Sequence, residues 1–273
     1  VGELKGAESL LIFSDNLPSP ENPQGENIQK HTRWQLISAR NLSPESRKKI
    51  DQDREKYIPA LFSRQALIVE GSSEIGFLPV AFHHFSERRP GQNPYHLGLE
   101  IVNGESRDKL FKHAKILRSY GKRCHLLYDY DVDVSDVVEN ERRSRFNGQV
   151  DFVTCWPRQN LLPFTTGCDL EVILAHYVPP DILFEAIKIA YSDSGHPLEE
   201  RNWRNACNKI LDMEIVNRFP DVFGGFNLNE FDLHSLGEEI NQRAFLFALL
   251  HGPHECKATK DMRMIAEYLA ERQ

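Results

Sequence analysis

Short apolar runs recur along the middle of the chain and end at acidic or glycine-containing turns. The runs that have the length of a buried strand are residues 66–69, 97–102 and 124–128, with a fourth candidate at residues 150–155. Amphipathic segments separate these runs. Such alternation predicts an α/β fold, with a sheet of mainly parallel strands flanked by helices.

The segments between and after the apolar runs have the spacing of helices. A helix is expected at residues 73–82, where Pro79 predicts a kink or an early end. A second helix carries Leu110, Ala114 and Leu117 on one face. Further helices are expected at residues 43–57, 181–191, 197–217, 233–250 and 258–272.

These elements divide the chain into three expected parts. Residues 1–42 are interpreted as a linker or the tail of a preceding domain, because residues 14–31 are rich in proline, serine, glycine and asparagine. Residues 43–175 are expected to form the α/β domain. Residues 176–273 are expected to add a helical subdomain, whose last helix carries a lysine.

Composition narrows the class of protein. Apolar residues make up 40% of the 273 and charged residues 27%, as in an ordinary globular protein. No apolar run approaches the roughly 20 residues that cross a bilayer, so no membrane partner is expected. Five scattered cysteines without a CxxC pair favour reduced thiols and a cytoplasmic location. The net charge of −7 argues against coating of nucleic acid by bulk attraction, although a local basic strip remains compatible with it.

An acidic turn follows the first apolar run, in the sequence Val-Glu-Gly-Ser-Ser-Glu at residues 69–74. Sheets of this class bind ligands at the carboxyl ends of their strands, where Glu70 would lie. Glu74 would project toward the same crevice from the first turn of the next helix. The alternative is purely structural, with Glu74 placed to favour the helix dipole.

A second acidic group follows the third apolar run. Asp129 and Asp131 alternate in an extended segment and can therefore face the same side. Neighbouring carboxylates repel each other, and a bound cation relieves the repulsion. Oxygen ligands suit Mg²⁺ or Mn²⁺. The alternative is a solvated acidic loop.

Together, the two acidic motifs and the strand that ends at Asn103-Gly104 resemble the TOPRIM domain, a Rossmann-like fold shared by topoisomerases, primases and OLD (overcoming lysogenisation defect) nucleases. The resemblance covers about residues 60–175. It implies that Glu70, Asp129 and Asp131 are metal ligands. The VEGxxE pattern looks most like OLD nucleases, which adds Glu74.

The resemblance to OLD nucleases also implies functional residues farther along the chain. Asp169 and Glu171 look like the downstream acidic pair of this family, with Glu171 the better candidate ligand. A late lysine of the family stabilises charge on the scissile phosphate. Lys260 is the preferred counterpart because it lies closer to the last helix, and Lys257 is the alternative.

The resemblance implies a DNA endonuclease that hydrolyses phosphodiester bonds with two Mg²⁺ or Mn²⁺ ions, in phage or foreign-DNA defence. The sequence has no GxxxxGK[ST] phosphate-binding loop. The chain also begins at Val1 without a methionine or signal-peptide features, so we expect it to be part of a longer protein. The resemblance to OLD nucleases implies that an ATPase domain lies elsewhere in that protein. The other expected partners are DNA, a helicase, and further copies of the chain in a homodimer or higher oligomer.

Other features allow two interpretations. Lys112, Lys115, Arg118 and Lys122 recur at helical spacing and predict either a basic face for phosphates or a solvated helix face. A zinc site at His251, His254 and Cys256 is disfavoured because its spacing matches no standard finger and no fourth ligand is evident.

Two other functions compete with the nuclease. A TOPRIM-like module that only docks an ATPase or helicase would be expected to lose its acidic ligands, whereas this sequence keeps them. A receiver-like phospho-acceptor domain would need adjacent acids early in the fold and a single acceptor aspartate later. The Glu70-Gly71 turn and the late Asp129/Asp131 pair do not fit that order.

Overall fold

A computed structural model describes the greater part of the chain. The described residues are 9–15, 32–38, 44, 48, 54–88, 98–131, 152–156, 161–165, 167–194, 228, 230–251 and 259–272. The predicted helix at residues 197–217 lies outside them. Among the described helices, none combines the length and the apolar character needed to cross a bilayer.

The centre of the molecule is a four-stranded parallel sheet in the order β4-β3-β5-β7. Its strands are β3 (Gln65–Val69), β4 (Leu99–Asn103), β5 (Arg123–Tyr128) and β7 (Phe152–Cys155). Helix α3 (Ser72–Arg88) connects β3 to β4, and α4 (Arg107–Ser119) connects β4 to β5. The predicted α/β fold with mainly parallel strands is confirmed.

Helices cover both faces of this sheet. Alternate residues of a strand point to opposite faces. Ile68 and Leu126 pack with α4 and with α2 (Arg54–Phe62) on one face. Val69 and Leu127 pack with α3 on the other. Burial on both faces explains why these strands appear in the sequence as continuous apolar runs.

The strands end together at one edge of the sheet. Val69 lies opposite both Asn103 and Leu127, so the turns that follow β3, β4 and β5 are neighbours. Gly104 has no room for a side chain, because an added Cβ would lie 2.2 Å from Leu110 Cδ2 and 2.7 Å from the carbonyl oxygen of Val69. Glycine at this position lets the chain leave β4 close against β3.

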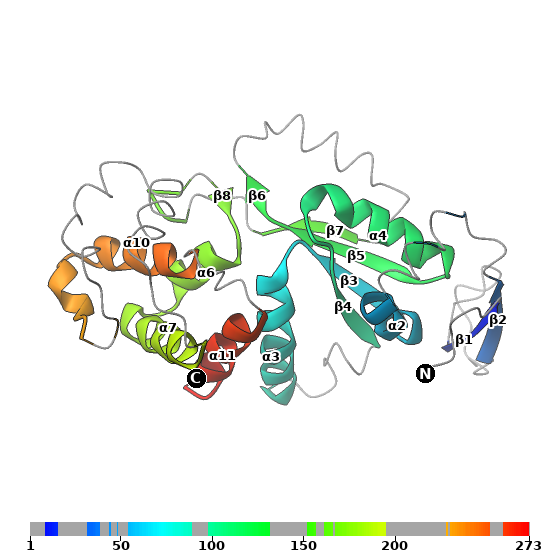
Figure 1. Ribbon diagram of the computed structural model, residues 1–273, viewed down its shortest axis with the longest axis horizontal. Helices are drawn as coiled ribbons and strands as arrows, with labels where there is room; N and C mark the ends of the chain where they lie inside the picture. The colour runs from blue at the N-terminus through cyan, green and yellow to red at the C-terminus, as the bar shows by residue number, and fades with distance from the viewer. Residues whose placement is uncertain are drawn as a thin grey trace, which may run out of the picture.

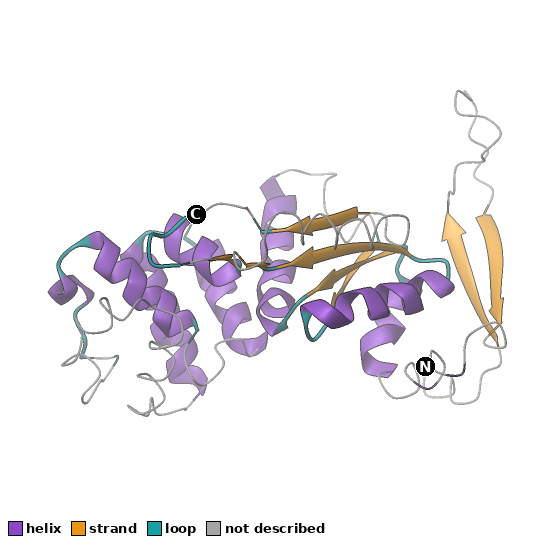
Figure 2. Ribbon diagram, turned by 90° about the horizontal axis from the view of Figure 1, so that it is seen from above, coloured by secondary structure: helices purple, strands orange, loops and turns teal. Residues whose placement is uncertain are grey.

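A helical part with its own apolar core lies beyond one end of the sheet strands (Figures 1 and 2). Its elements are α6 (Leu170–Tyr177), α7 (Pro180–Ser194), the 3-10 helix η2 (Leu233–Leu236), α10 (Glu239–Leu250) and α11 (Thr259–Ala270). Buried residues of this core begin at Leu162, and the division expected at residues 175/176 stays a prediction. Helix α11 lies beside α3 and joins the two parts (Figure 1).

Several elements differ in extent from the predictions. Helix α3 continues through Pro79 to Arg88, because packing against α11 and the sheet outweighs the hydrogen bond that proline removes. The predicted helix at 233–250 is divided by Gly237, whose φ of 73° favours glycine. Helix α2 extends past the predicted end at Tyr57.

Two small antiparallel pairings were not predicted. Near the start, β1 (Ser9–Asp15) pairs with β2 (Thr32–Ser38). In the middle of the chain, β6 (Tyr130–Asp131) pairs with β8 (Gly167–Cys168), with Tyr130 opposite Cys168. The second pairing matters for the site, because it places the start of α6 beside the chain that leaves β5.

Candidate metal centre

The carboxyl ends of β3 and β5 bring together the first two predicted metal ligands. Glu70 follows β3 and Asp129 follows β5, the neighbouring strand. The backbone N–H of Asp129 donates a 3.1 Å hydrogen bond to Glu70 Oε2. The turn after β5 is thus held directly against the side chain of Glu70.

Arg107, at the start of α4, holds this arrangement from the other side. Its Nη2 donates a 2.6 Å hydrogen bond to the carbonyl oxygen of Asp129, and its Nε lies 3.9 Å from Glu70 Oε2. The guanidinium also lies over the ring of Tyr128, 5.6 Å from its centroid. The contacts to Asp129 and Glu70 are those of a residue that orients two neighbouring acids, and sequence reasoning did not single it out.

Glu74 lies in the first turn of α3 and is buried, with 3% of its surface exposed. Its Oε2 accepts a 3.1 Å hydrogen bond from the N–H of Gly71, the reach-back of a helix capping box. Burial, and secondarily the charge of Glu171, raise the pKa of Glu74 to about 7. Glu74 therefore has a structural contact at the start of α3, and it also lies close enough to Glu171 for their charges to interact.

The downstream acidic pair reaches the same region from α6. Asp169 caps α6 by accepting a 2.8 Å hydrogen bond from Val172 N at its Oδ1. Glu171 is buried in the first turn, and its Oε1 accepts a 2.7 Å hydrogen bond from the hydroxyl of Ser73 on α3. The start of α3 and the start of α6 therefore meet at a buried hydrogen bond to a carboxylate.

His251, at the end of α10, joins the acidic pair. Its Nε2 lies 3.2 Å from Asp169 Oδ2, and one ligand atom from each of Asp169, Glu171 and His251 lies within 4.8 Å of the others. In the sequence, His251 was considered only with His254 and Cys256, which lie outside the described residues. Its place beside Asp169 depends on helix packing, for which no local signal exists in the sequence.

Asp129 is the point at which all these acids meet. Burial raises its pKa well above the ordinary range, and the charges of Glu74, Asp169, Glu70 and Glu171 raise it further. Among the described residues, none forms a hydrogen bond to its buried Oδ1. Five carboxylates from three segments, with an open buried oxygen among them, fit the oxygen ligands that a divalent cation requires.

For three other predicted site residues, the structure gives at most the element in which each one lies and its exposure. The backbone of Asp131 lies in β6, but its side chain is not described, and Lys257 lies outside the described residues. Lys260 is exposed in the first turn of α11. The residue before it, Thr259, contacts α3, since a Cβ added at Gly76 would lie 2.2 Å from the Thr259 carbonyl oxygen. The start of α11 therefore lies near the first turns of α3.

The predicted basic face is present in part. Lys112, Lys115 and Arg118 are exposed on α4, opposite its buried residues. Lys122 is a correction, because its side chain is buried and its Nζ donates a 2.6 Å hydrogen bond to the carbonyl oxygen of Ser63. Helix α4 ends at Ser119, so the helical spacing that grouped Lys122 with the others does not extend to it.

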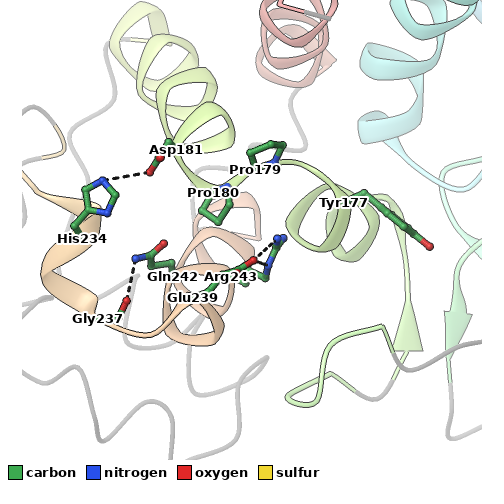
Figure 3. A pocket seen from close by; sticks show the side chains of 9 residues that line it. All are labelled: Tyr177, Pro179, Pro180, Asp181, His234, Gly237, Glu239, Gln242 and Arg243. Atoms are coloured by element: carbon green, nitrogen blue, oxygen red, sulfur yellow. Dashed lines mark hydrogen bonds and ion pairs between the residues drawn. The ribbon is translucent and has the colours of Figure 1, made fainter.

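An open pocket of about 430 Å³ in the helical part contains none of the predicted metal ligands (Figure 3). It is lined by Tyr177, Pro179, Pro180, Asp181, His234, Gly237, Glu239, Gln242 and Arg243. Arg243 contacts Glu239 here, and its Nη1 also donates to the carbonyl oxygens of Ala175 and His176 at the end of α6. Arg243 thereby ties α10 to α6, the two helices that carry His251 and the acidic pair.

Comparisons with curated proteins and with solved structures found no match. The family model described as "Overcoming lysogenization defect protein-like, TOPRIM domain" matches residues 61–131. That stretch runs from the end of α2 through β5 into β6 and contains Glu70, Glu74 and Asp129 at the edge described above. Residues 61–131 therefore form a TOPRIM domain of the OLD-like type.

Proposed function

We propose that this protein is a metal-dependent DNA endonuclease that hydrolyses phosphodiester bonds with two divalent ions, Mg²⁺ or Mn²⁺. The observation that carries the proposal is the convergence of carboxylates on Asp129, whose buried Oδ1 has no hydrogen-bond partner among the described residues. Mutual repulsion makes such a cluster unfavourable without cations. The OLD-like TOPRIM match supports a nuclease over other metal-binding proteins.

The positions of the carboxylates suggest which residues would hold each of the two ions. Glu70 and Asp129, with Asp131, would hold an ion at the carboxyl edge of the sheet. Glu74, Asp169 and Glu171 would hold an ion between α3 and α6. Ions in such sites activate water and stabilise charge on the phosphate. Arg107 orients the first group and Ser73 the second, since each contacts those carboxylates or their backbone.

The remaining residues of the proposed nuclease lie outside the cluster. Lys260 is proposed to stabilise the phosphate in the transition state, with Lys257 as the alternative. Lys112, Lys115 and Arg118 are proposed to contact the DNA backbone. We further propose that the chain is the catalytic part of an OLD-type ATPase-nuclease in phage or foreign-DNA defence, as a homodimer or higher oligomer, with a helicase as a further candidate partner.

Cleavage of supercoiled plasmid tests this function. The wild-type protein should convert supercoiled DNA to nicked or linear forms with Mg²⁺ or Mn²⁺ and not with a chelator. Asp129→Asn should remove the activity while the protein stays folded, because the substitution removes a ligand charge and relieves repulsion. Asp181→Asn is the matched control, since Asp181 is exposed and lies in the pocket that contains none of the predicted metal ligands.

The outcomes separate the candidate functions. Cleavage that persists unchanged in Asp129→Asn would contradict the proposed site. Divalent-ion binding without cleavage of any DNA form would favour the non-catalytic docking module. Absence of both binding and cleavage in the wild-type protein would contradict the metal centre itself.

A further inference from the structure

We propose that His251 is a metal ligand, together with Asp169 and Glu171, and that this half of the centre binds Mn²⁺ in preference to Mg²⁺. The inference rests on the proposed metal centre and adds a nitrogen ligand to it. Neither the acidic motifs nor the residues matched by the family, 61–131, contain His251.

The three side chains already have the arrangement of a partial coordination shell. Their ligand atoms lie within 4.8 Å of one another, a span that one ion can bridge. The side chain of His251 is 11% exposed and that of Asp169 21%, while Glu171 is buried. A cation at this position would therefore be largely shielded from water, where protein ligands replace its hydration most effectively.

An independent feature lies close to two of these three residues. The buried Oδ1 of Asp129 has no hydrogen-bond partner among the described residues, and the Asp129 carboxylate interacts electrostatically with both Asp169 and Glu171. A carboxylate oxygen left open in a buried acidic cluster is a candidate ligand atom. Asp129 would thus complete the shell from the side of the sheet.

Helix packing holds His251 in place for this role. Arg243, two turns earlier on α10, donates hydrogen bonds of 2.6 Å to the carbonyl oxygens of Ala175 and His176 at the end of α6. The end of α6 therefore lies beside the first half of α10, and the start of α6 lies beside the end of α10. From Arg243 to His251 is about 12 Å of helix, comparable with the length of α6.

The imidazole is also restrained locally. The backbone N–H of His251 donates a 3.1 Å hydrogen bond to the carbonyl oxygen of Phe247, one turn back on α10, and so fixes the residue that carries the ring. The ring packs against that of Phe247 with 4.4 Å between centroids. A restrained ring loses little conformational freedom on binding an ion, which favours coordination.

The nitrogen ligand decides which ion is favoured. Mg²⁺ demands oxygen ligands and dehydrates reluctantly, whereas transition metals accept imidazole nitrogen. The imidazole of His251, added to the carboxylates of Asp169, Glu171 and Asp129, therefore shifts selectivity from Mg²⁺ toward a transition metal. Mn²⁺ is the member of that series that also suits carboxylate-rich sites.

Metal binding without any substrate tests the proposal. Calorimetric titration of the chelator-treated protein should show tighter binding of Mn²⁺ than of Mg²⁺ in the wild type. His251→Gln should raise the Mn²⁺ dissociation constant about tenfold or more and change that of Mg²⁺ by less than roughly threefold. His234→Gln, a substitution on η2 at an exposed histidine outside the cluster, should change neither.

Electron spin-echo spectroscopy of bound Mn²⁺ provides a readout that does not depend on a variant folding well. The wild-type protein should show coupling to a directly bound ¹⁴N nucleus, and His251→Gln should lose it. Absence of the coupling in wild-type protein that does bind Mn²⁺, or equal effects of His251→Gln on Mn²⁺ and Mg²⁺ affinity, would overturn this inference and leave the proposed nuclease intact. Absence of all divalent-ion binding would instead contradict both.

Discussion

The hydroxyl of Ser73 donates a 2.7 Å hydrogen bond to Glu171, which lies far along the chain in the first turn of α6, a helix of the helical part. Ser73 lies in the turn of α3 that also carries Glu74, next to the carboxyl edge of the sheet. The bond is buried and therefore protected from water. It joins the part of the centre that the TOPRIM match covers to a part that lies outside it.

Removal of this hydrogen bond should weaken the metal centre through Glu171. Ser73→Ala removes the hydrogen bond that the described residues donate to the buried Glu171 carboxylate, which should lower the free energy of unfolding by about 1–3 kcal/mol in metal-free protein. Loss of a residue that orients a ligand should also weaken Mn²⁺ or Mg²⁺ binding by about 10-fold to 100-fold. Chemical denaturation and calorimetric titration measure the two effects.

Ser72→Ala is the matched control, because Ser72 is the neighbouring serine in the same helical turn. Its effect on metal affinity should be small. Equal metal affinity in Ser73→Ala and the wild type would show that Glu171 does not depend on this hydrogen bond, or that it is not a ligand.

The metal-free protein should lose stability as the pH rises, because the pKa of Glu74 is raised from its ordinary 4.5 to about 7. Between these values the unfolded chain gives up the proton while the folded protein keeps it. The free energy of unfolding should therefore fall by about 3 kcal/mol from pH 4.5 to 7, and this contribution should be flat above pH 7. The raised pKa of Asp129 acts in the same direction.

Urea denaturation in chelator, at several pH values, measures this dependence. Glu74→Gln should flatten the fall, and saturating Mg²⁺ should restore stability at pH 7 and above in the wild type because cations offset the carboxylate charges. Glu185→Gln, at an exposed acid on α7, should leave the slope unchanged. A wild-type stability that does not change with pH across this window would contradict the raised pKa of Glu74, which burial and, secondarily, the charge of Glu171 produce.

The parts of the centre differ in how far the sequence predicted them. Glu70 and Asp129 follow apolar strands, and parallel strands place their carboxyl ends at one edge, so local pattern was enough to bring them together. Asp169 and Glu171 have no such local signal and came only from the resemblance to OLD nucleases. His251 reaches the centre through helix packing, which periodicity does not reveal. Arg107 follows β4 at the same edge of the sheet, so strand order places it there, although the sequence analysis did not single it out.

Lys122 was wrongly predicted to lie on the exposed basic face, although the sequence contained a feature that argued against it. Three- and four-residue spacing groups Lys122 with Lys115 and Arg118 only if the helix continues. Gly121, with a φ of 72°, ends it at a left-handed turn instead. The glycine was therefore the better guide, since it marks the residue after which helical spacing no longer applies.

The basic face of α4 should govern the salt dependence of DNA binding. Replacement of Lys112, Lys115 and Arg118 together by glutamine should weaken binding and reduce the slope of log affinity against log salt by up to about 3. Lys122→Met is the contrast, because Lys122 is buried against the Ser63 carbonyl, and it should affect stability rather than the slope. Fluorescence anisotropy of labelled duplex at several salt concentrations gives both slopes, and equal slopes in the triple variant and wild type would exclude this face.

Gly76 packs against α11 so closely that no side chain should be tolerated at this position. An added Cβ would lie 2.2 Å from the Thr259 carbonyl oxygen and 3.0 Å from Arg263 N, both backbone atoms. Gly76→Ala should therefore destabilise the protein by about 2–4 kcal/mol, even though alanine favours helices by about 1 kcal/mol over glycine. Chemical denaturation measures the change, with Ser192→Ala on the exposed side of α7 as a control; unchanged stability would mean that α3 and α11 are farther apart.

The two late lysines are expected to differ in their effect on cleavage. Lys260 lies in the first turn of α11. The preceding residue, Thr259, contacts α3 at Gly76, two residues after Glu74. If Lys260 stabilises charge on the phosphate, Lys260→Ala should slow cleavage by about a hundredfold or more, the scale for loss of one preorganised charge. Metal affinity and DNA affinity should change little, because the charge acts in the transition state.

Single-turnover cleavage by Lys260→Ala and Lys257→Ala, with metal and DNA at saturation, separates the two residues. Lys257→Ala should be mild and serves as the matched control, since it removes the same charge three residues earlier. The opposite ranking would move the role to Lys257. Two mild variants would contradict a phosphate-stabilising lysine in this region and leave charge stabilisation to the metal centre and to arginines such as Arg107, which already lies 3.9 Å from Glu70.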